Sequence, residues 1–199
     1  MVISRVKEKI ATLFLEDPTK EYNILEISKS TKVNYRLAHT ETMNLKKEGI
    51  LSINKKGTMN ICKINLSANI PLYAYIESLR TELFQKKQIK IKVVRHELDK
   101  ISTCYYTALI FGSYAQGRER EKSDLDLLFI VPDETDTGKF EGKVQTCLRL
   151  LSYHLDINVI TEESFREMGR SQGLNIRTEV IKNHIILTGA EAYYRLLEK

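Results

Sequence analysis

The second half of the chain contains a stretch that reads YTALIFGSYAQGREREKSDLDLLFIV, residues 106–131. An apolar run leads into Gly112-Ser113, and a second apolar run follows Ser123-Asp124-Leu125-Asp126. Ten residues separate Ser113 from Asp124. Short apolar runs bounded by glycine, serine and aspartate are typical of buried strands. The stretch therefore predicts two buried strands joined by a polar connection.

Three acidic residues follow the strand pattern closely enough to predict a metal site. Side chains alternate along a strand, so Asp124 and Asp126 point to one face and Leu125 to the other. Adjacent carboxylates repel unless a cation lies between them, and oxygen ligands suit Mg²⁺ or Mn²⁺. Asp156 is the one charged residue in the apolar segment 155–160, where burial is costly unless it is paired. Three carboxylates on adjacent strands can hold two metal ions.

The glycine and serine residues around the carboxylates predict a phosphate site. Gly112-Ser113 at the end of a strand lets the backbone approach a phosphate closely, and a helix from about Tyr114 would direct N–H groups at it. Ser123 adds a hydroxyl beside the first carboxylate. Gly112, Ser113 and Ser123 are therefore the predicted nucleotide-binding residues, next to Asp124, Asp126 and Asp156 as metal ligands and catalytic residues.

Taken together, these motifs resemble the polymerase-beta-type nucleotidyltransferase superfamily, and 185–191 is similar to the last strand and turn of its minimal members. The resemblance implies a mixed-sheet domain over residues 104–199 that transfers a nucleoside monophosphate, with ATP as the expected donor, to an acceptor. Asp124 and Asp126 would bind both metal ions, and Asp156 would complete the acceptor-side metal and help deprotonate the nucleophile. Ser113 and the Gly112 backbone would hold the triphosphate.

One departure from that family concerns the residue before Gly117. Minimal members often carry arginine there, whereas this chain has Gln116, with Arg118 after the glycine. The departure weighs against carrying over the behaviour of the antitoxin subgroup, in which a partner toxin is adenylylated. It leaves the metal ligands in place.

The first third of the chain predicts three helices and a hairpin. Apolar residues recur at helical spacing in three segments, and the third is expected to run from Asn34, as its N-cap, to Lys47. Two strands, 50–53 and 59–64, flank a turn-rich tip. Residues 1–66 thereby resemble winged helix-turn-helix DNA-binding domains, in which the recognition helix enters the major groove. The implied DNA-binding residues are Tyr35, Arg36, His39 and Thr40 on that helix and Lys55 and Lys56 at the hairpin tip.

The distribution of charge favours double-stranded DNA as the partner of that first part. Residues 1–66 carry a net charge of +5, residues 67–103 carry +3 and residues 104–199 carry −3. Winged helices also serve as protein-interaction modules, which is the alternative for the first part, but a basic surface favours nucleic acid. The acidic last part includes the three candidate metal ligands.

Residues 67–103 predict a long connecting helix that starts near Pro71 and ends near Ser102. Leu72, Ile76, Leu79 and Leu83 form a seam with coiled-coil-like spacing. Two interpretations stay open: the helix packs on its own domains, or it pairs with a second copy in a homodimer.

The composition excludes several classes of protein. The 199 residues are 42% hydrophobic and 29% charged, which is an ordinary globular composition. Cys62, Cys104 and Cys147 are scattered, with no metal-ligand spacing, and indicate a reducing compartment. A start that is charged from residue 5 is unlike a signal peptide, and the apolar runs are too short for a membrane span. A cytoplasmic protein without membrane contact is expected.

The sequence thus predicts an α+β protein: a winged helix-turn-helix, a connecting helix and a nucleotidyltransferase domain. The leading hypothesis is an active transferase with a DNA-binding or partner-binding part. A second is a transcription regulator whose nucleotidyltransferase-like domain senses nucleotide without turnover. A third is an antitoxin that represses its own operon and modifies or masks a toxin. Retention of all three carboxylates favours the first, while the acceptor stays unidentified.

Overall fold

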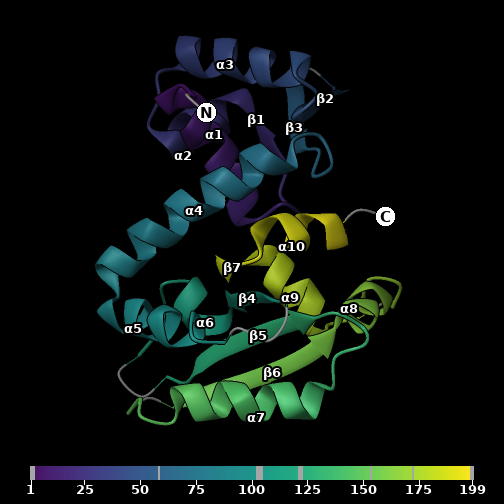
Figure 1. The fold of residues 1–199 in the computed structure, drawn as a ribbon. Coiled ribbons are helices and arrows are strands. Elements are labelled where there is room, and N and C mark those ends of the chain that lie inside the picture. Colours follow the sequence, from purple (N-terminus) through teal and green to yellow (C-terminus); the bar gives the residue numbers. More distant parts are fainter. Residues whose placement is uncertain are drawn as a thin grey trace.

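A computed structural model describes residues 3–57, 59–101, 105–120, 123–152, 154–171 and 173–197. Its helices and strands form an N-terminal part, a pair of connecting helices and a C-terminal part built on a mixed sheet (Figure 1). The α3 helix lies at one end of the molecule and α7 at the other (Figure 1). Within those residue ranges, no helix has the length and apolar character that crossing a membrane requires.

The N-terminal part contains the three helices and the hairpin that the sequence predicts. Its elements are α1 (Arg5–Glu16), β1 (Tyr22–Asn23), α2 (Ile24–Thr31), α3 (Tyr35–Lys47), β2 (Leu51–Lys56) and β3 (Met59–Ile64). Side-chain caps begin the helices: Asn23 forms a capping box with Glu26, and the Asn34 side chain accepts a hydrogen bond from the Leu37 N–H. The two-residue strand β1 was not predicted; it pairs with β3 and makes a three-stranded sheet in the order β1-β3-β2.

The prediction of one unbroken connecting helix was wrong, because the segment forms two helices. They are α4 (Ile70–Lys87) and α5 (Ile89–Leu98), and Gln88 between them leaves the helical conformation with φ −123° and ψ 85°. The expected helix end at Ser102 lies outside the described residues. Leu72 and Ile76 of the apolar seam are buried inside the chain's own core, whereas Leu83 is exposed. The first half of the seam therefore packs intramolecularly, as the first interpretation expected, while Leu79 is half-buried and Leu83 exposed.

The C-terminal part is a four-stranded mixed sheet in the order β6-β5-β4-β7. Its strands and helices are β4 (Thr107–Ile110), α6 (Gly112–Ala115), β5 (Leu125–Val131), α7 (Thr137–Leu148), β6 (Leu155–Thr161), α8 (Glu162–Met168), α9 (Ile176–Lys182), β7 (Ile185–Thr188) and α10 (Ala190–Leu197). The β5 and β6 strands are parallel, while β4 runs antiparallel to both β5 and β7. Both strands predicted around the Gly-Ser and Asp-x-Asp motifs are confirmed, and the α+β class with a mixed sheet is confirmed as well.

Helices cover both faces of this sheet, and alternate residues of β5 point to different cores. Leu127 and Phe129 pack with α5 and α7, whereas Leu128 and Ile130 pack with α4, α8, α9 and α10 (Figure 1). The hydrophobic cluster that contains Leu128 and Ile130 continues without interruption into α1, α2 and α3 of the N-terminal part. The N-terminal part and one face of the sheet therefore share a single hydrophobic core, and α4 lies in the middle of it.

Two of the three cysteines can be assigned. Cys62 and Cys147 are free thiols, and burial raises the pKa of Cys62 to about 11. A thiol of this kind behaves as a small apolar side chain, as expected from the sequence. Cys104 lies outside the described residues.

A buried ionic network joins α4 to the C-terminal part. The Glu77 carboxylate is fully buried and accepts hydrogen bonds from Arg80 Nη1 at 2.7 Å and from the Tyr194 hydroxyl at 2.7 Å. Arg80 Nη2 donates to the backbone carbonyl of His184 at 3.1 Å, and the Thr81 hydroxyl donates to the carbonyl of Ile186 at 2.6 Å. Burial, the largest single influence, opposes ionisation of Glu77, but Arg80, His184 and Tyr194 together outweigh it, and the pKa falls to about 2.

Replacing Glu77 with glutamine tests this network. The substitution leaves the buried Arg80 guanidinium without its counter-charge, so the free energy of unfolding is expected to fall by about 3 kcal/mol. Glu97→Gln is the matched control: it breaks a more exposed pair with Lys100 and should cost less than about 1 kcal/mol. Urea denaturation measures both variants. Equal losses in the two would contradict a special role for the buried pair.

Candidate active site

The strand register places two of the three predicted carboxylates opposite each other. Asp126 of β5 is the register partner of Asp156 of β6. Because the two strands are parallel and the residues are paired, their side chains lie on the same face, the face that also carries Leu128. Asp124 lies just before β5 and is exposed, so it approaches from the edge of the sheet. The predicted cluster on adjacent strands is therefore present for Asp126 and Asp156, with Asp124 beside them.

Gly112 and Ser113 lie directly against Asp126. The backbone N–H of Phe111 donates to the carbonyl of Asp126 at 3.1 Å, and the N–H of Ser113 donates to the Asp126 carboxylate. Gly112 has φ +65°, and a Cβ atom built there would lie 1.9 Å from Asp126 Oδ2. Glycine is thus required twice at this position, for the left-handed backbone and for the space that the carboxylate fills.

A fourth carboxylate, Glu179 of α9, belongs to the same electrostatic group. Burial raises the pKa of Asp126, and Asp156, Glu179 and Asp124 raise it further, in that order. We call Asp124, Asp126, Asp156 and Glu179 the carboxylate cluster. The sequence analysis missed Glu179, because no local pattern indicates that α9 packs beside β5 and β6.

The donor chemistry of this cluster fits a divalent cation. Acidic side chains surround Asp126 and raise the free energy of its charged form, and a hard cation with a preference for oxygen would relieve that repulsion. In the described part of the chain, however, no three His, Cys, Asp or Glu side chains lie close enough together to hold one ion. Asp126 and Asp156, which the register pairs, are the residues that would hold the ion.

A cavity of about 590 Å³ opens beside the cluster. Asp156, Asn158 and Glu179 contribute polar side chains to its wall, and Phe111 and Ile176 contribute apolar ones. Asn158 lies two residues after Asp156 on β6, so the two side chains share a face. The cavity therefore gives a molecule of ligand size access to the carboxylates.

Ser123 has a local structural contact in this structure. Its hydroxyl accepts a hydrogen bond from the Arg120 N–H at 2.8 Å, and its own N–H donates to the Arg120 carbonyl at 2.9 Å. These two bonds tie Ser123 to Arg120 just ahead of Asp124. The Gln116 side chain, directly before Gly117, accepts a hydrogen bond from Arg118.

The candidate DNA-binding residues lie far from the carboxylate cluster along the chain, and all of them are exposed. They are Tyr35, Arg36, His39 and Thr40 at the start of α3 and Lys55 and Lys56 at the end of β2. The side chains of Leu25, Leu37 and Met59 are also about half exposed in this region. The surface around the start of α3 therefore combines cationic, aromatic and aliphatic groups.

Sequence comparison assigns the family of the C-terminal part. The family described as polymerase beta, nucleotidyltransferase matches residues 89–192, just over half of the chain, from the first residue of α5 into α10. No curated protein matches the chain. The chain belongs to the polymerase beta nucleotidyltransferase family, and membership indicates nucleotidyl transfer as the general class of activity.

The raised pKa of Asp126 predicts a gain in stability when its charge is removed. The folded protein binds a proton at Asp126 more tightly than the unfolded chain does, so ionised Asp126 destabilises the fold above that pKa. In EDTA, Asp126→Asn should therefore unfold at higher urea concentration than the wild type at about pH 7, and the gain should shrink towards about pH 4.

Asp136→Asn serves as the control of opposite sign. Hydrogen bonds from Lys139, at the start of α7, lower the pKa of Asp136, so its charged form stabilises the fold and the asparagine variant should gain nothing at neutral pH. A wild-type midpoint that equals or exceeds that of Asp126→Asn at neutral pH would contradict the electrostatic account.

Proposed function

We propose that the protein is a divalent-metal-dependent nucleotidyltransferase that transfers a nucleoside monophosphate from a nucleoside triphosphate, with ATP as donor, to a separate acceptor. The observation that carries the proposal is the pairing of Asp126 with Asp156, with Gly112-Ser113 packed against Asp126. This brings a carboxylate pair and a glycine-serine turn to one place. Family membership supports the same chemistry.

In this proposal, each residue has a defined task. Asp124, Asp126 and Asp156 hold Mg²⁺ or Mn²⁺, which neutralises charge on the reacting phosphate and the leaving pyrophosphate. Ser113 and the backbone at Gly112 bind the triphosphate, and Asp156 accepts the proton of the acceptor hydroxyl. The catalytic gain comes from positioning and charge neutralisation, as in other phosphoryl transfer. Ser123 supports the turn before Asp124 and contributes indirectly to nucleotide binding.

The cavity beside the cluster is where we place the acceptor. Asp156 and Asn158 reach it from β6, and Glu179 reaches it from α9. An acceptor bound there would present its nucleophile to Asp156. The chemical class of the acceptor, whether protein hydroxyl, RNA end or small molecule, is left open by these contacts.

For residues 1–66 we propose a winged helix-turn-helix that binds double-stranded DNA, joined through residues 67–103 to the transferase domain at 104–199. The element order, the exposed start of α3 and the exposed lysines of the hairpin support this. Tyr35, Arg36, His39 and Thr40 would face the major groove, and Lys55 and Lys56 the phosphates. A cytoplasmic location accords with the free thiols.

The alternative is a regulator that binds nucleotide without turnover or acts as an antitoxin on a partner. The observation in its favour is the open arrangement of the carboxylates, since no three of them are gathered around one point in the described ranges. The transfer assay separates this alternative from catalysis. A homodimer receives little support, because Leu72 and Ile76 of the α4 seam are buried within the chain.

The transferase activity is tested with radiolabelled ATP, Mg²⁺ or Mn²⁺ and a cell lysate as the source of acceptors. The wild type should label at least one acceptor, and Asp126→Asn together with Asp156→Asn should lower the rate on the order of 1000-fold, because the phosphate charge is then unneutralised. If no component of the lysate is labelled although the protein binds the nucleotide, the result would support the regulator instead.

Two glycine variants sharpen this test. Gly112→Ala and Gly49→Ala both place a side chain at positive φ, but only Gly112 lies against Asp126. Gly49→Ala should cost about 1 kcal/mol of stability, and Gly112→Ala should cost more, because its Cβ also displaces the Asp126 carboxylate. Transfer should be lost only in Gly112→Ala. Equal activity in the two variants would show that the turn does not position Asp126.

DNA binding is tested with the triple variant Arg36→Ala, Lys55→Ala, Lys56→Ala. Loss of three contacts should weaken duplex binding at least about tenfold. The slope of the logarithm of the binding constant against the logarithm of salt concentration should fall by roughly two to three released counterions. The control removes the same charge from α5 and the end of α7 by Lys92→Ala, Lys143→Ala and Arg149→Ala, all exposed. Fluorescence anisotropy at several salt concentrations measures both. Equal weakening in the control would leave residues 1–66 as a protein-interaction module.

A further inference from the structure

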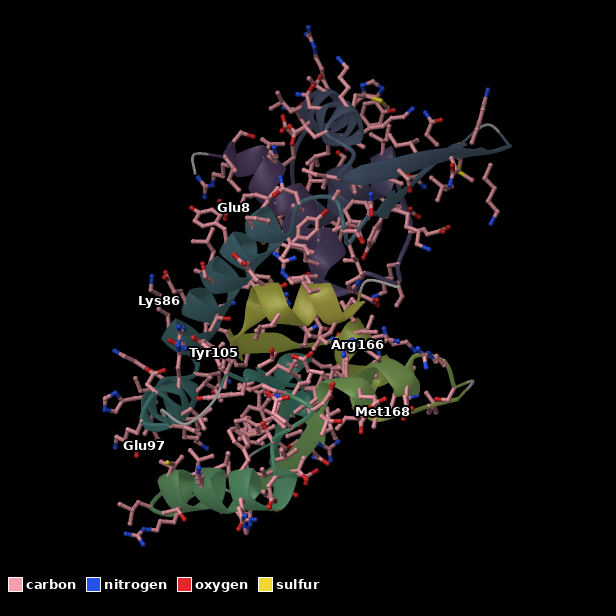
Figure 2. The ribbon with its side chains drawn as sticks, turned by 45° about the vertical axis from the view of Figure 1, so that its right-hand side comes forward. Glu8, Lys86, Glu97, Tyr105, Arg166 and Met168 are labelled. Atoms are coloured by element: carbon pink, nitrogen blue, oxygen red, sulfur yellow. The ribbon has the colours of Figure 1, made fainter. Side chains whose placement is uncertain are left out.

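A second cavity, of about 560 Å³, lies where the N-terminal part meets the transferase domain. Its wall is formed by α1, by the end of α4, by the turn that follows α6 and by the residues that lead into β7. Neither Gly112 nor Ser113 lines it, and no residue of the carboxylate cluster does. Lys86, labelled in Figure 2, marks the end of α4 at which this cavity is found. We call it the junction pocket.

Several polar groups of the junction pocket are held in place by hydrogen bonds. Arg80 is fixed between Glu77 and the His184 carbonyl. Gln88, at the break between α4 and α5, donates through its side-chain amide to Glu119 Oε1. His184 Nδ1 lies 2.7 Å from the Val180 carbonyl, so this ring nitrogen carries the proton. The wall is therefore organised in the absence of a ligand.

Two buried polar atoms of this wall have no hydrogen-bond partner among the described residues, His184 Nε2 and Glu119 Oε2. His184 Nε2 lies 3.7 Å from Glu77 Oε1, inside the buried ionic network, which leaves Glu119. Glu119 Oε2 is buried and accepts no hydrogen bond from any described residue. A buried carboxylate oxygen without a donor is costly, and buried polar atoms in folded proteins nearly always have a partner. Since a carboxylate can only accept, the missing partner has to be an N–H or O–H group. Glu119 therefore indicates a ligand that donates a hydrogen bond.

The rest of the wall narrows the class of ligand. Phe84 and Leu83 provide an apolar surface beside Glu119, suited to a flat ring. Lys87 is exposed at the last turn of α4 and also lines the pocket, where it is suited to a phosphate. The volume lies within the range of sites for small organic ligands. A flat heterocycle with an amino group and a phosphate satisfies all three features.

We propose that the junction pocket binds a purine nucleotide whose exocyclic amino group donates to Glu119, at a site separate from the carboxylate cluster. Thr12 and Glu16 of α1 form part of the same wall. The ligand therefore contacts the N-terminal part and the transferase domain at once. This proposal does not rest on the transferase activity, since it concerns a different set of residues.

The test is equilibrium binding of AMP to the full-length protein by isothermal titration calorimetry. AMP should bind saturably, and IMP, which has a carbonyl where AMP has the amino group, should bind at least about tenfold more weakly. Glu119→Gln should weaken AMP binding by a similar factor. No saturable AMP binding up to about 5 mM, or equal affinities for AMP and IMP, would overturn the proposal.

The variant that combines Asp126→Asn with Asp156→Asn locates the site. It should bind AMP with wild-type affinity, because neither residue lines the junction pocket. Loss of AMP binding in this variant with retention in Glu119→Gln would place AMP at the carboxylate cluster and overturn the proposal. The IMP comparison uses the wild type alone, so the result stands even if Glu119→Gln folds poorly. Lack of transfer activity would leave the outcome of this experiment unchanged.

Discussion

The fold depends on a carboxylate that is buried together with its counter-charge. Glu77 lies in the middle of α4 with no exposed surface, and Arg80 and Tyr194 supply the hydrogen bonds that make its burial tolerable. Arg80 in turn holds the backbone that leads into β7. Because α4 also packs against α1, this network fixes the sheet relative to the N-terminal part. The junction pocket, whose wall includes residues of α1, depends on that placement.

Asp126 presents the opposite situation. Its neighbours are Asp156, Glu179 and Asp124, and the hydrogen bond from Ser113 is the contact that lowers its pKa against them. The chain therefore contains one buried carboxylate that is compensated and one partly buried carboxylate that is not. The compensated carboxylate, Glu77, stabilises the folded structure. The uncompensated one, Asp126, would be stabilised by a bound cation, so cation binding would lower the free energy of the folded protein. Asp126 lies within residues 89–192, which match the nucleotidyltransferase family.

The sequence predicted those features that depend on local pattern. Alternation in β5 and β6 is enough to place Asp126 and Asp156 on one face, and Asn34 is enough to begin α3. Features that depend on tertiary packing were missed. Glu179 joins the carboxylate cluster only because α9 folds against the sheet, and Glu77 resembles any surface charge of a helix until α10 brings Tyr194 to it. The break between α4 and α5 at Gln88 was also missed, because no glycine or proline lies there to indicate the end of a helix.

The shared core has a consequence for how the two parts can communicate. Leu15 of α1 and Leu109 of β4 belong to one uninterrupted cluster of buried side chains, so within the described residues the N-terminal part is packed directly onto the nucleotidyltransferase domain. Changes in one part cannot be absorbed by a hinge of loose chain and must instead alter packing across α4. Reorientation of α3 relative to the sheet would therefore require the shared hydrophobic core to repack.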